Sequence, residues 1–179
     1  MKFSYYKKLS AANQRIYDAS DKLARVDLPD AMSLQPLMAP LAAALLADRR
    51  PAVEELCIHL ATGMLEQLTA PPVNLKVLAV RPSNRYGELH GLYEGVEGRL
   101  RTARITLWMR TAQKKQPVAF RSFLRTCLHE LCHHLDFEHF RLGDSFHTEG
   151  FYKLESSLFY QLMPEAAAEK ARRDSGKKT

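Results

Sequence analysis

The spacing of apolar positions along this 179-residue chain changes near residue 72. Before that point apolar residues recur every three to four positions, which is typical of amphipathic helices. The helices predicted from this spacing cover residues 10–28, 36–47 and 51–68. Pro51 suits the first turn of the third helix, where its missing N–H costs nothing, and Pro71-Pro72 ends the helical pattern. Residues 1–70 are therefore predicted to form an N-terminal helical region.

Beyond residue 72 the chain has short apolar and β-branched runs separated by turn residues. These runs predict strands over residues 73–80, 87–94 and 104–110, with a turn at residues 95–98 before the last strand. The last strand is the clearest, because Ile105, Leu107 and Met109 alternate onto one face. Three strands in a row predict a small, mostly antiparallel meander.

Helical spacing returns after the strands. A long helix is predicted to begin at Gln116-Pro117 and to end near residue 135 or 137. A further helix is predicted between Thr148, a suitable N-cap, and Pro164. The expected fold class is thus α+β, with N-terminal helices, a three-stranded sheet, a long central helix and a following C-terminal helix. Residues 71–164 are the predicted central domain, packed with the N-terminal region, and residues 165–179 a basic flexible tail.

The composition indicates one ordinary globular chain with a real core, since 46% of the residues are hydrophobic and 26% are charged. The N-terminus lacks the apolar stretch of a signal peptide. The most apolar run, residues 36–47, is shorter than the ~20 residues that span a bilayer. Three cysteines without an export signal argue against a disulfide framework. The expected location is the cytoplasm, with no membrane partner.

Positive charge is concentrated in the middle of the chain. The formal net charge is +6, and residues 76–125 hold eleven Lys and Arg against three Glu. A solvated basic face is the simpler interpretation. The alternative is a surface that contacts DNA or an acidic partner.

The strongest chemical signal lies on the predicted long helix, where residues 129–133 read His-Glu-Leu-Cys-His. Because a helix turns once in 3.6 residues, His129 and His133 lie on one face and can bind one ion. Glu130 is rotated by about 100°, beside the ion. A carboxylate there can take a proton from a zinc-activated water and pass it to a leaving amine. The pattern predicts zinc-dependent hydrolysis.

A catalytic zinc needs a third protein ligand and an open position. The downstream candidates are His139, His147, Glu149 and Glu155, with Asp136 and Asp144 as weaker options. His139 has the spacing of the pattern His-Glu-x-x-His-x-x-Gly-x-x-His, but Asp136 stands at the glycine position, where a positive φ is less well tolerated. The spacing alone leaves the third ligand open.

Residues 73–158 resemble the SprT-like zinc metallopeptidase domain. The resemblance rests on a glycine-containing hairpin and a strand with Ile-Thr-Leu-Trp at residues 105–108, then on Leu-His-Glu-Leu-Cys-His-His at residues 128–134. It rests finally on His-Thr-Glu-Gly-Phe-Tyr-Lys-Leu at residues 147–154, which is similar to the family element His-x-x-x-Phe-x-x-Leu/Met.

The resemblance implies a zincin-like fold with one catalytic Zn²⁺. Its metal ligands are then His129, His133 and His147, and Glu130 is the general base. In such domains the strand before the active helix forms the lip of the cleft and pairs with a substrate chain. The resemblance implies that residues 104–110 are this strand. The expected partner is a protein or peptide substrate.

Three functions compete on this sequence. The first is a zinc-dependent metallopeptidase that uses Glu130 as its base. The second is a nucleic-acid- or partner-binding domain on a zincin-like scaffold with weak or no peptidase activity, motivated by the basic residues 76–125. The third is zinc hydrolysis of a small amide or peptide, which a deep closed pocket would favour over an open groove.

Overall fold

The computed structural model describes residues 2–84, 87–96 and 101–175. The helical elements are η1 Ser4–Lys8, α1 Ala11–Ser20, α2 Ala31–Leu34, η2 Gln35–Leu37, α3 Met38–Leu46, α4 Arg50–Gln67, α5 Phe120–Glu138, α6 Glu149–Leu162 and α7 Pro164–Ser175. The strands are β1 Asn74–Val80, β2 Ser83–Asn84, β3 Gly87–Glu88, β4 Gly91–Glu94 and β5 Arg104–Arg110. The α+β class is confirmed.

The first predicted helix is shorter than its apolar pattern. Helix α1 begins after the N-cap Ser10, whose side chain accepts a hydrogen bond from the backbone of Asn13, and it ends at Ser20. The backbone beyond it is held by a tertiary contact. The Gln161 side-chain amide accepts from the Leu28 N–H at 2.9 Å and donates to the Val26 carbonyl at 2.8 Å. These bonds satisfy backbone groups of Val26 and Leu28 that lie outside any helix.

The two helices that follow the sheet are confirmed with small shifts. Helix α5 begins at Phe120 rather than at residue 116, because Pro117 forms a bridge to Arg110 beside the sheet. Thr148 caps α6 as predicted, since its Oγ1 accepts from the Phe151 N–H at 2.9 Å. Helix α6 ends just before Pro164.

The sheet is mixed, with strand order β1-β5-β4, and the meander prediction is wrong in this respect. Strands β1 and β5 are parallel, and β4 and β5 are antiparallel. Residues 105–109 of β5 are all buried, so the most apolar strand takes the centre and β4 is left at the edge. The predicted strand over residues 87–94 divides into β3, which pairs with β2 in a separate two-stranded sheet, and β4.

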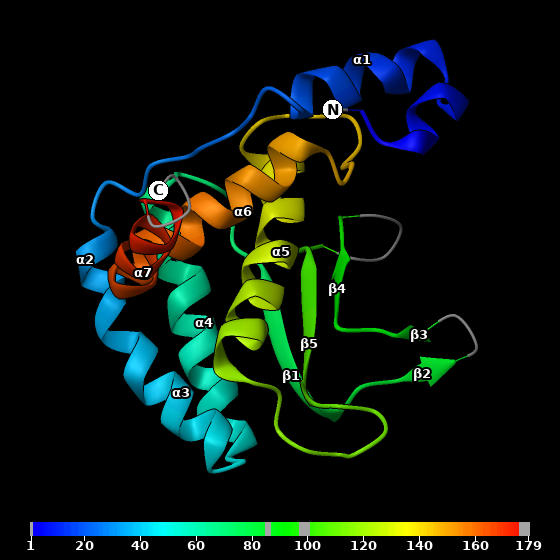
Figure 1. The fold of residues 1–179 in the computed structure, drawn as a ribbon. Coiled ribbons are helices and arrows are strands. Elements are labelled where there is room, and N and C mark those ends of the chain that lie inside the picture. Colours follow the sequence, from blue (N-terminus) through cyan, green and yellow to red (C-terminus); the bar gives the residue numbers. More distant parts are fainter. Residues whose placement is uncertain (1, 85–86, 97–100, 176–179) are drawn as a thin grey trace.

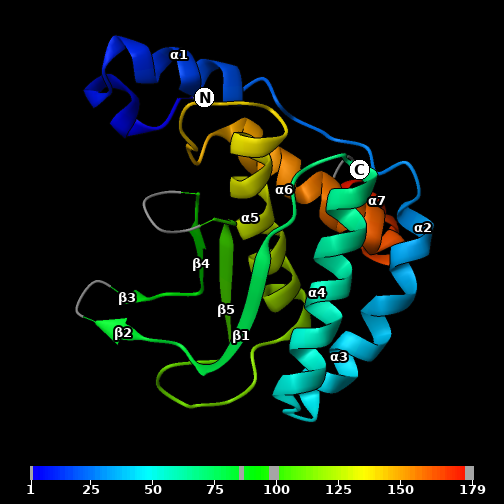
Figure 2. The same cartoon turned by 180° about the vertical axis from the view of Figure 1, so that it is seen from behind.

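Helices α4 and α5 pack against one face of this sheet, with α3 beside α4 and α6 across α5 (Figures 1 and 2). One continuous core joins the layers. Its fully buried members include Leu60 of α4, Leu107 of β5, Leu128 of α5 and Leu158 of α6. Because α5 lies between the sheet and α6, its remaining side is where functional side chains reach solvent.

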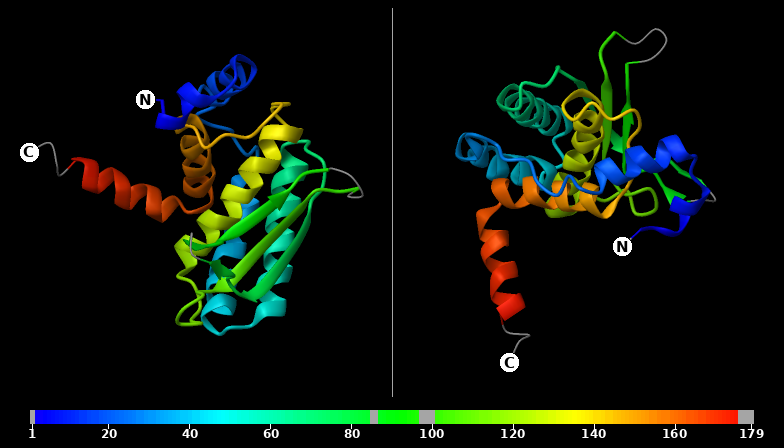
Figure 3. Two further views of the ribbon diagram at one scale, coloured as in Figure 1. Left: turned by 90° about the vertical axis from the view of Figure 1, so that its right-hand side faces the viewer. Right: turned by 90° about the horizontal axis from the view of Figure 1, so that it is seen from above.

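The C-terminal segment departs from the main body (Figure 3). Residues 164–175 form α7, which is tied to α5 by an ion pair between Arg121 and Glu169 at 3.0 Å. Residues 176–179 and the second half of the predicted turn at 95–98 lie outside the described residues. The division at residues 70 and 164 stays a prediction. No helix in the described part of the chain is long and apolar enough to cross a lipid bilayer.

Candidate metal centre

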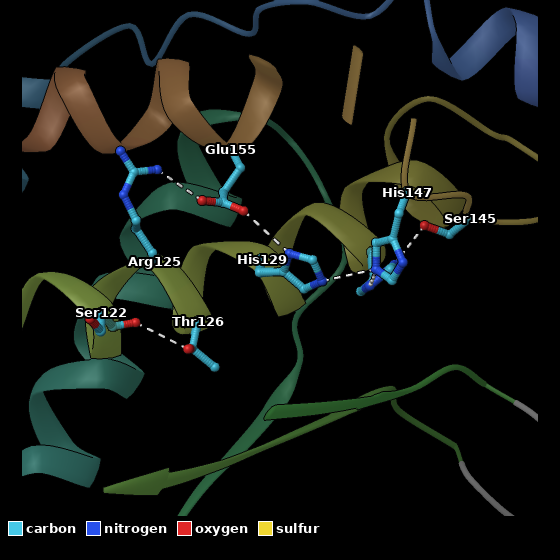
Figure 4. Close-up of polar contacts among 8 residues, drawn as sticks. Ser122, Arg125, Thr126, His129, Ser145, His147 and Glu155 are labelled. Carbon is cyan, nitrogen blue, oxygen red and sulfur yellow. Dashed lines mark hydrogen bonds and ion pairs between the residues drawn. The ribbon is translucent and has the colours of Figure 1, made fainter. Parts of the chain in front are cut away.

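Three imidazoles meet at the exposed side of α5. His129 and His133 lie one turn apart on α5, and His147 comes from the loop that follows this helix. The Nε2 atom of His147 lies 2.9 Å from Nε2 of His129 and 3.1 Å from Nε2 of His133, and Figure 4 shows the first pair directed at each other. Within the described ranges, these side chains form the His, Cys, Asp or Glu group that can hold a metal ion.

The donor set fits zinc. Three nitrogens bound at about 2.0–2.1 Å in a tetrahedral site stand about 3.3 Å apart, close to the separations observed. Burial and the neighbouring His129 and His147 lower the pKa of His133 to about 3. Burial also lowers the pKa of His147. Both imidazoles are therefore neutral at pH 7, which is the form that binds a metal.

The second ring nitrogen of His129 contacts a carboxylate on α6. Nδ1 of His129 lies 3.2 Å from Oε2 of Glu155, and the other oxygen of Glu155 accepts from Arg125 Nη1 at 3.0 Å (Figure 4). A carboxylate in this position fixes the Nδ1–H tautomer and aims the Nε2 lone pair at the metal. Glu155, one of the candidate ligands from the sequence, is thus placed to orient a ligand.

His133 is oriented by a shorter relay within the loop. Its Nδ1 lies 2.7 Å from Oγ of Ser145, and this hydroxyl donates to Oδ2 of Asp136 at 2.6 Å. Burial raises the pKa of Asp136 to about 6, and the hydrogen bond from Ser145 opposes that shift. The relay through Ser145 therefore places Asp136 behind the candidate ligand His133. Ser145 carries no motif signal in the sequence and was not predicted.

The other candidate ligands lie away from the three nitrogens. Helix α5 continues through Asp136 to Glu138, so the chain makes no turn at residue 136, where the pattern that ends in His139 has a glycine. With a rise of 1.5 Å per residue, His139 lies about 15 Å along the axis from His129. Glu149 forms a surface ion pair with Lys153 at 2.7 Å. Asp144 lines the cleft and accepts from the backbone N–H of Ser145.

Glu130 lies beside the histidines, packed against the backbone of β4. The residue is 7% exposed, and burial raises its pKa to about 7, against the lowering effects of His129 and a backbone hydrogen bond from Tyr93. A Cβ atom added at Gly91 would lie 2.4 Å from Oε1 of Glu130 and 2.7 Å from its Cγ. The glycine therefore provides the space in which the carboxylate lies, a requirement that no sequence pattern revealed.

The site opens into a cleft of about 630 Å³ between β4 and α5. Leu92 and Tyr93 of β4 line one wall, and Phe137 and Glu130 of α5 line the other. Among the described residues, β4 pairs with β5 alone and its outer edge has no strand partner. The predicted lip, residues 104–110, is the central strand instead, so β4 replaces it beside the cleft.

Tyr93 connects this edge strand to α5, the helix that carries His129 and His133. Its ring stacks on those of His133 and Phe137, with centroids 6.3 and 5.9 Å apart. Its hydroxyl lies 3.3 Å from Nδ1 of His134, whose Nε2 donates to the carbonyl of Pro71 at 2.8 Å. The third histidine of α5 therefore links strand and helix and does not face the ion.

Part of the positive charge of residues 76–125 is balanced by ion pairs. Five of their arginines form ion pairs, and the pairs are Arg81–Glu88, Arg104–Glu94, Arg110–Asp48, Arg121–Glu169 and Arg125–Glu155. Three of these carboxylates lie outside the region in sequence, so its local charge excess overstates the positive surface. Contact with DNA stays a prediction.

No protein-family model, curated protein or solved structure matches this chain.

Proposed function

We propose that the chain is a zinc-dependent metallopeptidase of the SprT-like type. One observation carries this proposal, namely that three imidazole nitrogens converge beside Glu130 in a cleft bordered by an edge of β4 that has no strand partner among the described residues. A three-histidine set with one open side is characteristic of catalytic rather than structural zinc. The order of His129, Glu130, His133 and His147 along the chain is also the order that the resemblance to the SprT-like domain implies.

The residues of the chain divide the chemistry between them. When bound, zinc acts as a Lewis acid that polarises a carbonyl and lowers the pKa of a coordinated water. Glu155 and Ser145 hold the imidazoles of His129 and His133 in the metal-binding tautomer. Glu130 accepts the proton of the attacking water on its carboxylate and returns it to the leaving amine.

An extended polypeptide is the substrate class that suits the cleft. The free edge of β4 offers backbone donors and acceptors that an extended chain can pair with as an added strand. Leu92 on this strand is 38% exposed, and the nearby Leu89 is 41% exposed, so apolar side chains of a substrate find contacts along the rim. An open cleft of this kind favours a polypeptide over a small amide.

Replacement of Glu130 by Gln tests the mechanism. The variant should bind one zinc ion per chain and lose hydrolysis of an unfolded protein substrate, because an amide of the same shape cannot accept the proton. Glu138→Gln is the matched control, since Glu138 is on the same helix but pairs with Arg141 at 3.6 Å, outside the cleft. Retained hydrolysis by Glu130→Gln would refute the proposal, as would a purified wild-type protein that binds no zinc.

A further inference from the structure

The third ligand differs from the other two in how its ring is held. Nδ1 of His129 meets Glu155 and Nδ1 of His133 meets Ser145, whereas no hydrogen bond to Nδ1 of His147 is found among the described residues. His147 is also the exposed member of the three. The orientation of its imidazole therefore depends on the backbone that carries it.

That backbone belongs to the loop between α5 and α6, and it is held from outside by the N-terminal segment. The Tyr5 hydroxyl donates to the carbonyl oxygen of His147 at 3.2 Å. One residue later, Oγ1 of Thr148 lies 3.2 Å from Oγ of Ser20 in a buried contact. The polar contacts thus begin at the ligand itself, although 142 positions separate Tyr5 from it.

A third polar contact fixes the first turn of α6. The backbone N–H of Gly150 donates to Oδ1 of Asp21 at 3.1 Å. The two backbones approach so closely that a Cβ atom added at Gly150 would lie 2.4 Å from the carbonyl oxygen of Ser20. Contact at this range leaves the loop little freedom to move relative to α1.

Aromatic side chains also pack between the N-terminal segment and the loop that carries His147. Tyr17 of α1 is fully buried, and its ring centroid lies 6.1 Å from that of Phe146, the residue before the ligand. Phe3 packs edge-on against Tyr152, with centroids 6.3 Å apart, and Tyr152 stacks on His147 at 6.0 Å. Figures 1 and 3 show α1 running beside this loop and the start of α6, apart from the sheet.

We infer that residues 3–21 are a positioning element of the metal centre, which holds residues 147–150 so that the His147 imidazole completes the ligand set. Tyr5 and Asp21 are its positioning residues. This inference rests on the proposed metal centre and assigns a role to the N-terminal segment. Without these contacts, the exposed ligand would have to be ordered when the ion binds, and the affinity would fall by that entropic cost.

Zinc affinity of four full-length variants tests the inference, measured by competition with a chelator. Tyr5→Phe removes the hydroxyl that reaches His147, and Asp21→Ala removes the acceptor for Gly150. Both should bind zinc more weakly, on the order of tenfold for Asp21→Ala. Asp21→Asn keeps the Oδ1 acceptor and should restore the wild-type affinity.

Tyr6→Phe is the matched control for Tyr5→Phe. It removes a hydroxyl from the same 3₁₀ helix, but that hydroxyl donates to Oδ2 of Asp18 at 3.1 Å and does not reach the loop. It should leave zinc affinity unchanged. The visible spectrum of the cobalt-substituted protein provides a second measurement, which should change in Asp21→Ala and not in Tyr6→Phe.

The outcomes separate this inference from the proposed function. If the wild-type protein binds zinc and all four variants bind it equally well, the positioning role is wrong and the metal centre stands. If affinity falls in Tyr6→Phe as much as in Tyr5→Phe, in step with a lower melting temperature of the metal-free protein, general destabilisation explains the result and the inference is overturned. A wild-type protein that binds no zinc overturns both.

Discussion

At the residue scale, the space left by Gly91 decides where the proposed base can lie. An alanine methyl group there would overlap Oε1 and Cγ of Glu130, so Gly91→Ala should displace the carboxylate while the histidines stay in place. Misplacement of a reacting group by about 1 Å can cost on the order of 100-fold in rate. We therefore expect a loss of that order in hydrolysis, with zinc affinity retained.

Gly95→Ala is the control for this substitution, because a Cβ atom there meets nothing closer than Tyr93 at 3.8 Å. Its activity should equal that of the wild type. Full activity in Gly91→Ala would show that Glu130 does not need its observed position.

A second residue-scale prediction concerns Asp136. Its pKa is raised from 3.8 to about 6 in the folded protein, so the folded state favours the neutral acid. This contribution to stability is complete below about pH 4 and is lost as the pH rises through 6. Asp136→Asn, which cannot ionise, should therefore raise the free energy of unfolding of the metal-free protein at pH 8, on the order of 2 kcal/mol.

Urea unfolding in the presence of a chelator measures this effect. The difference between Asp136→Asn and the wild type should be much smaller at pH 4, where the aspartic acid is neutral in the folded state and only partly ionised in the unfolded chain, whose pKa is near 3.8. The same difference at pH 4 and pH 8 would contradict the raised pKa.

At the element scale, α6 reaches the proposed metal centre through the contact of Glu155 with His129. Replacement of Glu155 by Gln should weaken zinc binding about tenfold, as expected when a partner of a metal-bound histidine is changed. Glu169→Gln is the control, because it removes an Arg–Glu pair between α5 and α7 that does not reach the site. Equal affinities in the two variants would show that the Glu155 contact does not orient His129.

The same elements show how far the sequence could predict this site. The pairing of His129 with His133 is local, because helical geometry alone brings residues four apart onto one face. The choice between His147 and His139 depends on α5 continuing past Asp136, and a predicted helix end near residue 135 or 137 left that choice open. The role of Glu155 in orienting His129 could not be predicted in this way, because it depends on the packing of α6 on α5 and not on a local sequence pattern.

The order of the strands was less accessible. The sequence predicts that β5 is the most apolar strand, but it places neighbouring strands side by side and so gives a meander. Insertion of β5 between β1 and β4 is a long-range choice that buries the apolar strand on both edges. As a result the strand edge beside the cleft belongs to β4. The short glycine-containing sequence of β4 did not indicate that it would lie there.

At the scale of the whole molecule, the proposed metal centre joins parts of the chain that are distant in sequence. Two of the proposed ligands lie on the central helix, whereas the third lies on a loop that contacts the N-terminal segment. Zinc should therefore stabilise the entire fold, because it binds the native arrangement and not the unfolded chain. At a free zinc concentration 100 times the dissociation constant, the stabilisation is about 2.7 kcal/mol.

For a chain of this length, that free energy corresponds to an increase in melting temperature of about 5–10 °C, measurable by thermal unfolding with and without a chelator. His147→Ala should abolish most of the increase, since two histidines on one helix are left to hold the ion. His139→Ala should retain it. If His139→Ala lost the increase and His147→Ala kept it, the third ligand would be His139 at the end of α5. The ion would then not contact the loop, and the N-terminal segment could not position a ligand through it.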